Sequence, residues 1–113
     1  MMDAITYRTG ESELLDAIEP LWRGLAQHHA TLSPHFSQWF LQRRFSDRKA
    51  EILAHASGGM RVQLAFCGTA DPVGFCVSTL KSTGEGEVDA IFVREACRGQ
   101  GIGGRFMREA LDW

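Results

Sequence analysis

Residues 98–104 read Arg98-Gly99-Gln100-Gly101-Ile102-Gly103-Gly104, and four of these seven residues are glycine. An apolar run before them predicts a strand over residues 87–93, and a helical pattern after them predicts a helix over residues 102–113. A glycine-rich turn that opens a helix suits phosphate, because the first helical N–H groups are unpaired and the helix dipole adds partial positive charge. We therefore expect a phosphate-binding turn flanked by Arg98 and Arg105; a plain connecting turn is the alternative.

Two other phosphate-binding patterns can be compared with this segment. Gly99, Gly101 and Gly104 have the G-x-G-x-x-G spacing of dinucleotide-binding folds. That fold needs a further strand with an acidic residue about 20 positions later, whereas only nine residues follow Gly104. The G-x-x-x-x-G-K-[ST] pattern of P-loop nucleotidases does not occur in the sequence. The spacing therefore disfavours both of these nucleotide-binding folds.

The residues before the glycine turn predict further strands. Residues 61–67 alternate between apolar and polar side chains, residues 68–72 contain turn-forming residues, and residues 73–80 form a second apolar run. This order predicts an antiparallel hairpin. Residues 81–86 are polar and contain glycine, so we expect them to connect the hairpin to the strand over residues 87–93.

The first half of the chain predicts one strand followed by helices. A short strand is expected over residues 4–8, and a helix follows with Ser12 as its N-cap. Pro20 lies inside that helical pattern and is expected to kink or split it, because proline within a straight helix costs about 3 kcal/mol. A second helical stretch is predicted to begin near Phe36, with a new helix N-cap predicted at Ser46-Asp47. The complete order is typical of an α/β or α+β layered domain.

Composition and charge restrict the class of protein. Of the 113 residues, 44% are hydrophobic and 23% are charged, so we expect one ordinary globular domain over residues 1–113. The net charge of −2 disfavours a nucleic-acid surface, and no apolar run reaches the roughly 20 residues of a membrane span. The N-terminus lacks the pattern of a secretion signal, and the three cysteines lack metal-binding spacing. We therefore expect a cytoplasmic protein with reduced thiols and no metal, nucleic-acid or membrane partner.

The strand and glycine turn together resemble a known motif. Glu87-Val88-Asp89-Ala90-Ile91-Phe92-Val93, followed by Arg94-Glu95-Ala96-Cys97 and the turn over residues 98–104, resembles motif A of the GNAT-type N-acetyltransferase superfamily. Residues 72–77 are similar to the third strand of that family. The resemblance implies a mixed sheet of about four strands with helices on both faces. Family members continue past the motif-A helix, so the resemblance also implies that a C-terminal strand and helix are missing here.

The resemblance implies that the chain uses acetyl-CoA as a co-substrate. Residues 100–104 would donate N–H groups to its pyrophosphate, and residues 91–93 would lie along its pantetheine arm. The Ile91 N–H is the candidate for polarising the thioester carbonyl, on which negative charge develops during attack. The complete set implied for cofactor binding is Ile91, Phe92, Val93, Arg98, Gly99, Gln100, Gly101, Ile102, Gly103 and Gly104.

Acetylation of an amine requires loss of a proton, and carboxylates often assist it. The acidic residues Glu85, Glu87 and Asp89 are expected to alternate along one face of the strand together with Ile91 and Val93. Carboxylates inside a sheet are costly unless they are paired, solvated or used. The resemblance implies that Glu87 is the first candidate for a catalytic role, because some family members place their base at this position, and Asp89 is the second; capping the solvent-facing end of the strand is the alternative. Tyr7, the only tyrosine, lies on the first strand and cannot match the general acid of the family.

Other polar residues have plainer interpretations. His28, His29 and His35 lack the i, i+4 spacing of a metal site, so we expect surface histidines, with acceptor binding as the alternative. Arg48-Lys49 are expected on a solvated helix face, with a surface for an acidic partner as the alternative.

The combined prediction is an N-acetyltransferase that acetylates a primary amine by direct transfer. The helical pattern runs to Trp113 without a C-cap, which motivates one alternative. In that alternative, the chain is a truncated and catalytically incompetent module that binds CoA weakly or forms a homodimer.

Overall fold

The computed structural model describes residues 4–24, 44–68 and 70–113 of the chain. Four strands form one sheet in the order β1-β2-β3-β4, and each neighbouring pair is antiparallel. In chain order, the elements are β1 (Thr6–Gly10), η1 (Ser12–Ile18), α3 (Phe45–His55), β2 (Gly59–Phe66), β3 (Gly74–Leu80), β4 (Gly86–Val93), η3 (Glu95–Cys97) and α4 (Ile102–Asp112).

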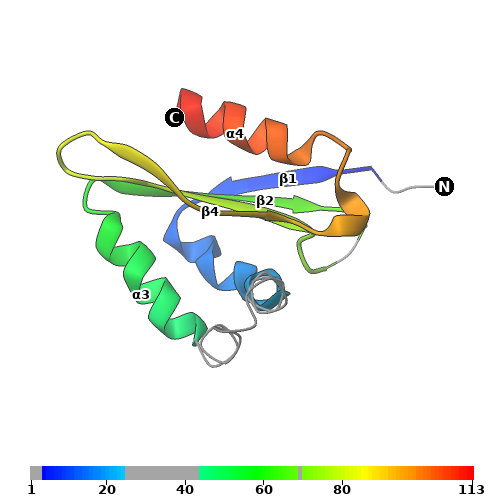
Figure 1. The fold of residues 1–113 in the computed structure, drawn as a ribbon, viewed down its shortest axis with the longest axis horizontal. Coiled ribbons are helices and arrows are strands. Elements are labelled where there is room, and N and C mark those ends of the chain that lie inside the picture. The colour runs from blue at the N-terminus through cyan, green and yellow to red at the C-terminus, as the bar shows by residue number, and fades with distance from the viewer. Residues whose placement is uncertain (1–3, 25–43, 69) are drawn as a thin grey trace, which may run out of the picture.

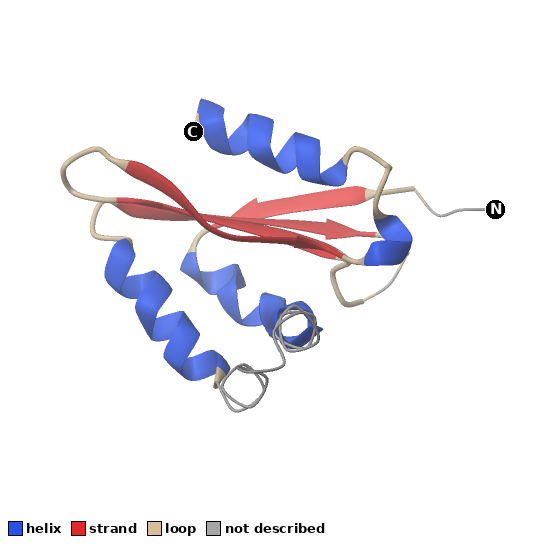
Figure 2. Cartoon of the chain, viewed as in Figure 1, coloured by secondary structure: helices blue, strands red, loops and turns tan. Residues whose placement is uncertain are grey.

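The sheet forms the middle layer of the fold. Helix α4 covers one face, while η1 and α3 cover the other (Figures 1 and 2). The predicted α/β layering with helices on both faces is therefore confirmed. The prediction of a mixed sheet is wrong for the described residues, because all their strand pairs are antiparallel. None of the helices in the described part of the chain is long and apolar enough to cross a membrane.

The strand predictions are confirmed with small shifts. The hairpin forms between β2 and β3, and β4 begins one residue earlier than expected. Strand β1 lies two residues later than predicted, because Thr9 and Gly10 pair with Gln63 and Val62 of β2. The alternation of apolar and polar residues predicts where a strand lies. The residues at which it begins and ends depend on its pairing with the neighbouring strand.

The first helical region changes type immediately before Pro20. Residues 12–18 form a 3-10 helix, and residues 19–24 are α-helical. Pro20 therefore lies in the first turn of the α-helical part, where proline is best tolerated. The predicted Ser12 cap is wrong: Glu11 is the N-cap residue, and its N–H donates to Glu13 Oε1 at 2.9 Å.

The predicted cap at Ser46-Asp47 is wrong: Arg44 is the N-cap residue, and α3 begins at Phe45. The predicted start of the second helical stretch near Phe36 and the three histidines at 28, 29 and 35 lie outside the described residues.

Two hydrophobic clusters fill the space on either side of the sheet. The larger cluster joins η1 and α3 to one face, through buried residues that include Leu15, Ile18 and Ile52. The smaller cluster lies under α4, where Ile102 and Phe106 pack against the opposite face. Helix α4 is thus held on the sheet by two apolar anchors one turn apart.

A polar network also holds α4 on the sheet. Gln63, which is 1% exposed, donates through Nε2 to Glu109 Oε2 at 2.9 Å. Arg61 donates to the Glu109 carbonyl oxygen at 3.1 Å, and Arg105 Nε donates to Glu109 Oε1 at 3.1 Å. Since Gln63 is buried in the sheet, Glu109 satisfies a polar group that water cannot reach.

Replacing Glu109 should therefore destabilise the fold. We expect Glu109→Ala to lower the free energy of unfolding by about 1–3 kcal/mol, because it leaves the buried Gln63 amide without its acceptor. Urea denaturation followed by circular dichroism measures this change. Glu109→Gln keeps an acceptor oxygen and should cost less, while Asp112→Ala on the exposed end of α4 should have little effect. Equal losses in all three variants would contradict this account.

The buried thiol of Cys76 gives a second prediction. Burial raises the pKa of Cys76, and this effect outweighs the Ser78 hydroxyl and the Arg61 charge, which lower it. Because the pKa is higher in the folded than in the unfolded state, Cys76 favours folding fully below the ordinary thiol pKa of about 8.5, and this contribution is lost at higher pH.

At about pH 8, a neutral alkylating reagent should therefore modify the partly exposed Cys97 much faster than Cys76. Mass spectrometry of the digested protein measures both rates, and urea should make them equal. Similar rates in the native protein would contradict the burial of Cys76.

Candidate functional site

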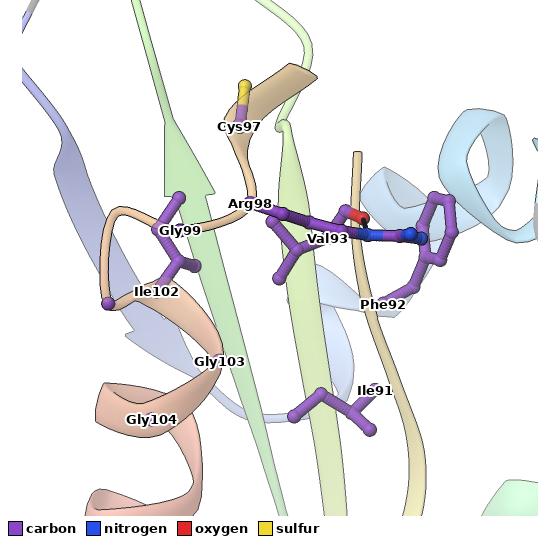
Figure 3. Close-up of a pocket in the computed structure, with 10 residues that line it drawn as sticks. Ile91, Phe92, Val93, Cys97, Arg98, Gly99, Ile102, Gly103 and Gly104 are labelled. Carbon is purple, nitrogen blue, oxygen red and sulfur yellow. Dashed lines mark hydrogen bonds between the residues drawn. The ribbon is translucent and has the colours of Figure 1, made fainter. Parts of the chain in front are cut away.

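A pocket lies between the end of β4 and the start of α4. Its volume is about 530 Å³. It is lined by Ile91, Phe92, Val93, Cys97, Arg98, Gly99, Gly101, Ile102, Gly103 and Gly104 (Figure 3). Nine of the ten residues implied by the motif-A resemblance thus lie around one cavity. The tenth, Gln100, is exposed and is not among the lining residues.

The backbone at the start of α4 presents N–H groups to this pocket. Gly101 is the N-cap residue and has the left-handed conformation, with φ 80° and ψ 7°. The Arg105 N–H donates to the Gly101 carbonyl oxygen at 3.0 Å, which closes the first turn. The N–H groups of Ile102, Gly103 and Gly104 precede that bond, so they have no partner within the helix. An anion in the pocket would meet them at the positive end of the helix dipole.

Gly103 is a glycine that the fold does not require. Gly101 needs glycine for its left-handed backbone, whereas Gly103 has no such conformation. A Cβ atom added at Gly103 would have no heavy atom within 4 Å. Glycine within a helix costs about 1 kcal/mol relative to alanine. Neither the backbone conformation nor crowding explains this cost.

The two arginines near the turn are bound to protein groups. Arg98 Nε donates to the Val93 carbonyl oxygen at 2.9 Å, and the Arg98 guanidinium carbon lies 5.8 Å from the centre of the Phe92 ring (Figure 3). Arg105 lies over the Tyr7 ring at 3.7 Å. Arg98 therefore ties the turn to β4, and Arg105 ties α4 to β1, rather than pointing freely into the pocket.

Strand β4 contains a β-bulge at Asp89. Ala90 pairs with Val77 and Val88 pairs with Ser78, so Asp89 has no partner residue on β3. The extra residue changes which side chains face which layer. Val88 packs in the cluster under α4, whereas Ala90 and its neighbour Phe92 pack against the cluster on the α3 side.

This bulge overturns one prediction. We expected Glu87, Asp89, Ile91 and Val93 to share one face, as uninterrupted alternation would require. Instead, Ile91 and Val93 line the pocket beside α4, whereas Asp89 contacts side chains of α3. The acidic residues and the pocket therefore lie on opposite faces of the same strand.

Asp89 is the centre of a hydrogen-bonded cluster on the α3 side. Its carboxylate oxygen Oδ1 lies 2.7 Å from His55 Nδ1, and Oδ2 accepts a hydrogen bond from the Thr79 hydroxyl. Its carbonyl oxygen accepts from Arg48 Nη2 at 2.7 Å. The Asp89 side chain is only 2% exposed, whereas Glu87, two residues earlier in β4, is exposed. Arg48 is thus not on a solvated helix face, which corrects the prediction for that residue.

Donor atoms of His55, Glu87 and Asp89 all lie within 4.8 Å of one another. Such a set is close enough to surround a cation, but His55 and Asp89 are already joined by a hydrogen bond. The arrangement suits the holding and transfer of a proton. His55 could not be predicted from the sequence, because it ends a helix 34 positions from Asp89 and no local pattern connects the two.

Comparison with family models gives one match. The model described as the acetyltransferase (GNAT) family matches residues 15–113. The comparison with curated proteins finds no match.

Comparison with solved structures finds related folds. A ribosomal-protein-alanine N-acetyltransferase from Brucella melitensis biovar Abortus 2308 is 22% identical, with a TM-score of 0.58; the alignment covers 96% of this chain and 70% of that one. A GNAT-family acetyltransferase from Staphylococcus aureus Mu50 is 14% identical, with a TM-score of 0.62 and coverage of 96% and 65%. AAC(6')-Iy, in complex with the bisubstrate analog CoA-S-monomethyl-acetylneamine, is 16% identical, with a TM-score of 0.58 and coverage of 98% and 71%. The chain thus spans about two thirds of the length of these structures.

If Gly103 serves a ligand rather than the fold, its replacement by alanine should stabilise the protein. We expect Gly103→Ala to raise the free energy of unfolding by about 0.5–1 kcal/mol, because alanine has the higher helix propensity. Gly101→Ala should instead lower it by about 1–2 kcal/mol, because of its left-handed backbone. Urea denaturation of both variants measures these changes. Destabilisation by Gly103→Ala would show that the fold itself needs this glycine.

Proposed function

The chain belongs to the acetyltransferase (GNAT) family, and we propose that it transfers the acetyl group of acetyl-CoA directly to a primary amine of an acceptor. Members of this family use acetyl-CoA as co-substrate. The observation that carries the proposal is the pocket at the start of α4. Backbone N–H groups there have no partner within the helix, and Gly103 among them is a glycine that the fold does not require. Residues 1–113 would act as one acetyltransferase-like domain.

The pyrophosphate of acetyl-CoA would bind at the start of α4. The N–H groups of Gly101, Ile102, Gly103 and Gly104 are its donors in this proposal, and Gln100 and Gly99 shape the turn before them. Gly103 lets the diphosphate approach the backbone, because no side chain stands between them. Arg98 contributes by holding the turn against Val93 and by placing a positive charge at the rim of the pocket.

The pantetheine arm would run from the turn along residues 91–93. Strand β4 is at the edge of the sheet within the described residues, so its outer backbone groups pair with no described strand. A bound arm can therefore hydrogen-bond to them as an added strand would. The Ile91 N–H is our candidate donor to the thioester carbonyl, where it would stabilise the negative charge that develops as the amine attacks.

The carboxylates on the other face of β4 would assist the acceptor. Because β4 is the edge strand of the described sheet, a thioester bound along it would be open to an amine from the side of α3. Glu87 is exposed there and would attract a positively charged amine. Both carboxylate oxygens of Asp89 are already hydrogen-bonded, one to His55 and the other to Thr79. Asp89 would therefore assist proton removal indirectly, without contacting the amine.

Calorimetry with acetyl-CoA tests the proposed cofactor site. We expect Gly103→Glu to weaken binding by at least about tenfold, because its carboxylate would occupy and repel the phosphate position. Met107→Glu is the matched control: it adds the same charge one turn along α4, at a residue that is 40% exposed. Its affinity should stay close to that of the wild type. Absence of acetyl-CoA binding by the wild type, or equal weakening in both variants, would overturn the proposal.

A further inference from the structure

We propose that His55 takes the proton that the acceptor amine loses, with Asp89 as its positioning residue. This inference rests on the proposed acetyl transfer and names the group that carries its proton step. It starts from the one described histidine that lies within hydrogen-bond distance of a buried carboxylate of β4.

The hydrogen bond between His55 and Asp89 decides which ring nitrogen is free. Nδ1 of His55 lies 2.7 Å from Asp89 Oδ1, and a carboxylate oxygen can only accept, so Nδ1 carries the hydrogen. The lone pair of the neutral ring is then on Nε2. The His55 side chain is 43% exposed, so an acceptor at the surface can reach it. A histidine with one nitrogen fixed and the other accessible is suited to general-base work.

Asp89 is held in place for this role and cannot perform the proton transfer itself. Its side chain is 2% exposed, and its second oxygen accepts the Thr79 hydroxyl. Arg48 holds the carbonyl oxygen of the same residue at 2.7 Å. The bulge explains why such a polar residue lies here: Asp89 has no partner residue on β3, and it turns toward α3. A buried carboxylate behind a histidine stabilises the imidazolium that forms during catalysis.

The position of the pair fits the proposed thioester site. Asp89 precedes Ile91 by two residues, which corresponds to roughly 7 Å along a strand. His55 therefore stands beside the part of β4 that would hold the thioester, on the face from which the amine would approach. Glu87 lies next to the pair, with its carboxylate within 4.8 Å of the other two donor groups, and would attract the ammonium form of the acceptor.

The proposed step balances without a further reactant. The ammonium form attracted by Glu87 first releases one proton to solvent. The resulting neutral amine nitrogen then attacks the thioester carbonyl carbon, and a C–N bond forms. His55 Nε2 takes one proton from that nitrogen as the intermediate collapses and the C–S bond breaks. The CoA thiolate leaves, and the imidazolium returns the proton to the sulfur through solvent. The products are the acetylated amine and CoA, and His55 is neutral again.

The experiment measures CoA release by the full chain from acetyl-CoA, with spermidine, an alanine-starting peptide and kanamycin as amine probes. The fastest probe is then used for the variants. We expect His55→Asn to lower kcat by about a hundredfold to ten-thousandfold and to leave acetyl-CoA binding unchanged, because asparagine keeps a donor to Asp89 but has no basic nitrogen. Leu53→Ala, an exposed change two residues earlier in α3, is the matched control and should keep the wild-type rate.

Imidazole rescue separates catalysis from a structural role. His55→Ala should lose as much activity as His55→Asn, and added imidazole should restore part of it, because the free ring can occupy the vacated space. Thr79→Val removes the hydroxyl that holds Asp89 and should lower kcat by a smaller factor without changing the KM for acetyl-CoA. This variant tests the positioning role of Asp89 without removing its charge from the interior.

Each contrary result identifies a different error. Absence of turnover by the wild type with every probe overturns the proposed function, and this inference with it. Turnover that His55→Asn leaves unchanged overturns this inference alone, as does a failure of imidazole to restore His55→Ala. Activity that EDTA removes and Zn²⁺ restores would make the cluster a cation site and would also overturn the inference.

Discussion

Strand β4 has one more residue than β3 offers for pairing, and the arrangement of the whole candidate site depends on this bulge at Asp89. Before the bulge, Val88 faces α4; after it, Ile91 and Val93 do. The extra residue shifts the alternation of β4, so that Asp89 faces α3 while Ile91 and Val93 face α4. Strand β4 presents apolar side chains and backbone groups to the pocket beside α4, and a polar cluster to α3. A cofactor and an acceptor can thus approach one strand from opposite faces.

Helix α4 shows how the fold separates stability from ligand access. Ile102 and Phe106 bury one side of the helix, and Glu109 adds polar contacts to Arg61 and Gln63 of β2. These anchors hold the helix firmly enough that its first turn can contain Gly103, a residue that disfavours helix formation. The N-terminal N–H groups are then held in place by the rest of the helix rather than by bonds of their own. The proposed anion site would therefore need little reorganisation before binding.

Family membership and the geometry support different parts of the functional account. The family match over residues 15–113 and the related folds support acetyl transfer in general. The pocket and the polar cluster are features of this chain's own side chains, and they suggest where the cofactor and the proton would go. The pocket and the polar cluster lie on opposite faces of β4, whose outer edge is unpaired within the described residues.

Sequence alone predicted the elements and the glycine turn, because both depend on neighbours within a few positions. The periodicity of residues 102–112, the alternation of β2 and the glycines at 99–104 are local signals, and the structure contains each of these elements. The faces of β4 could not be predicted, because the bulge arises from its register with β3. The pairing of His55 with Asp89 likewise joins residues 34 positions apart. Tertiary packing decides such contacts, since only the folded sheet determines which helix lies above each side chain.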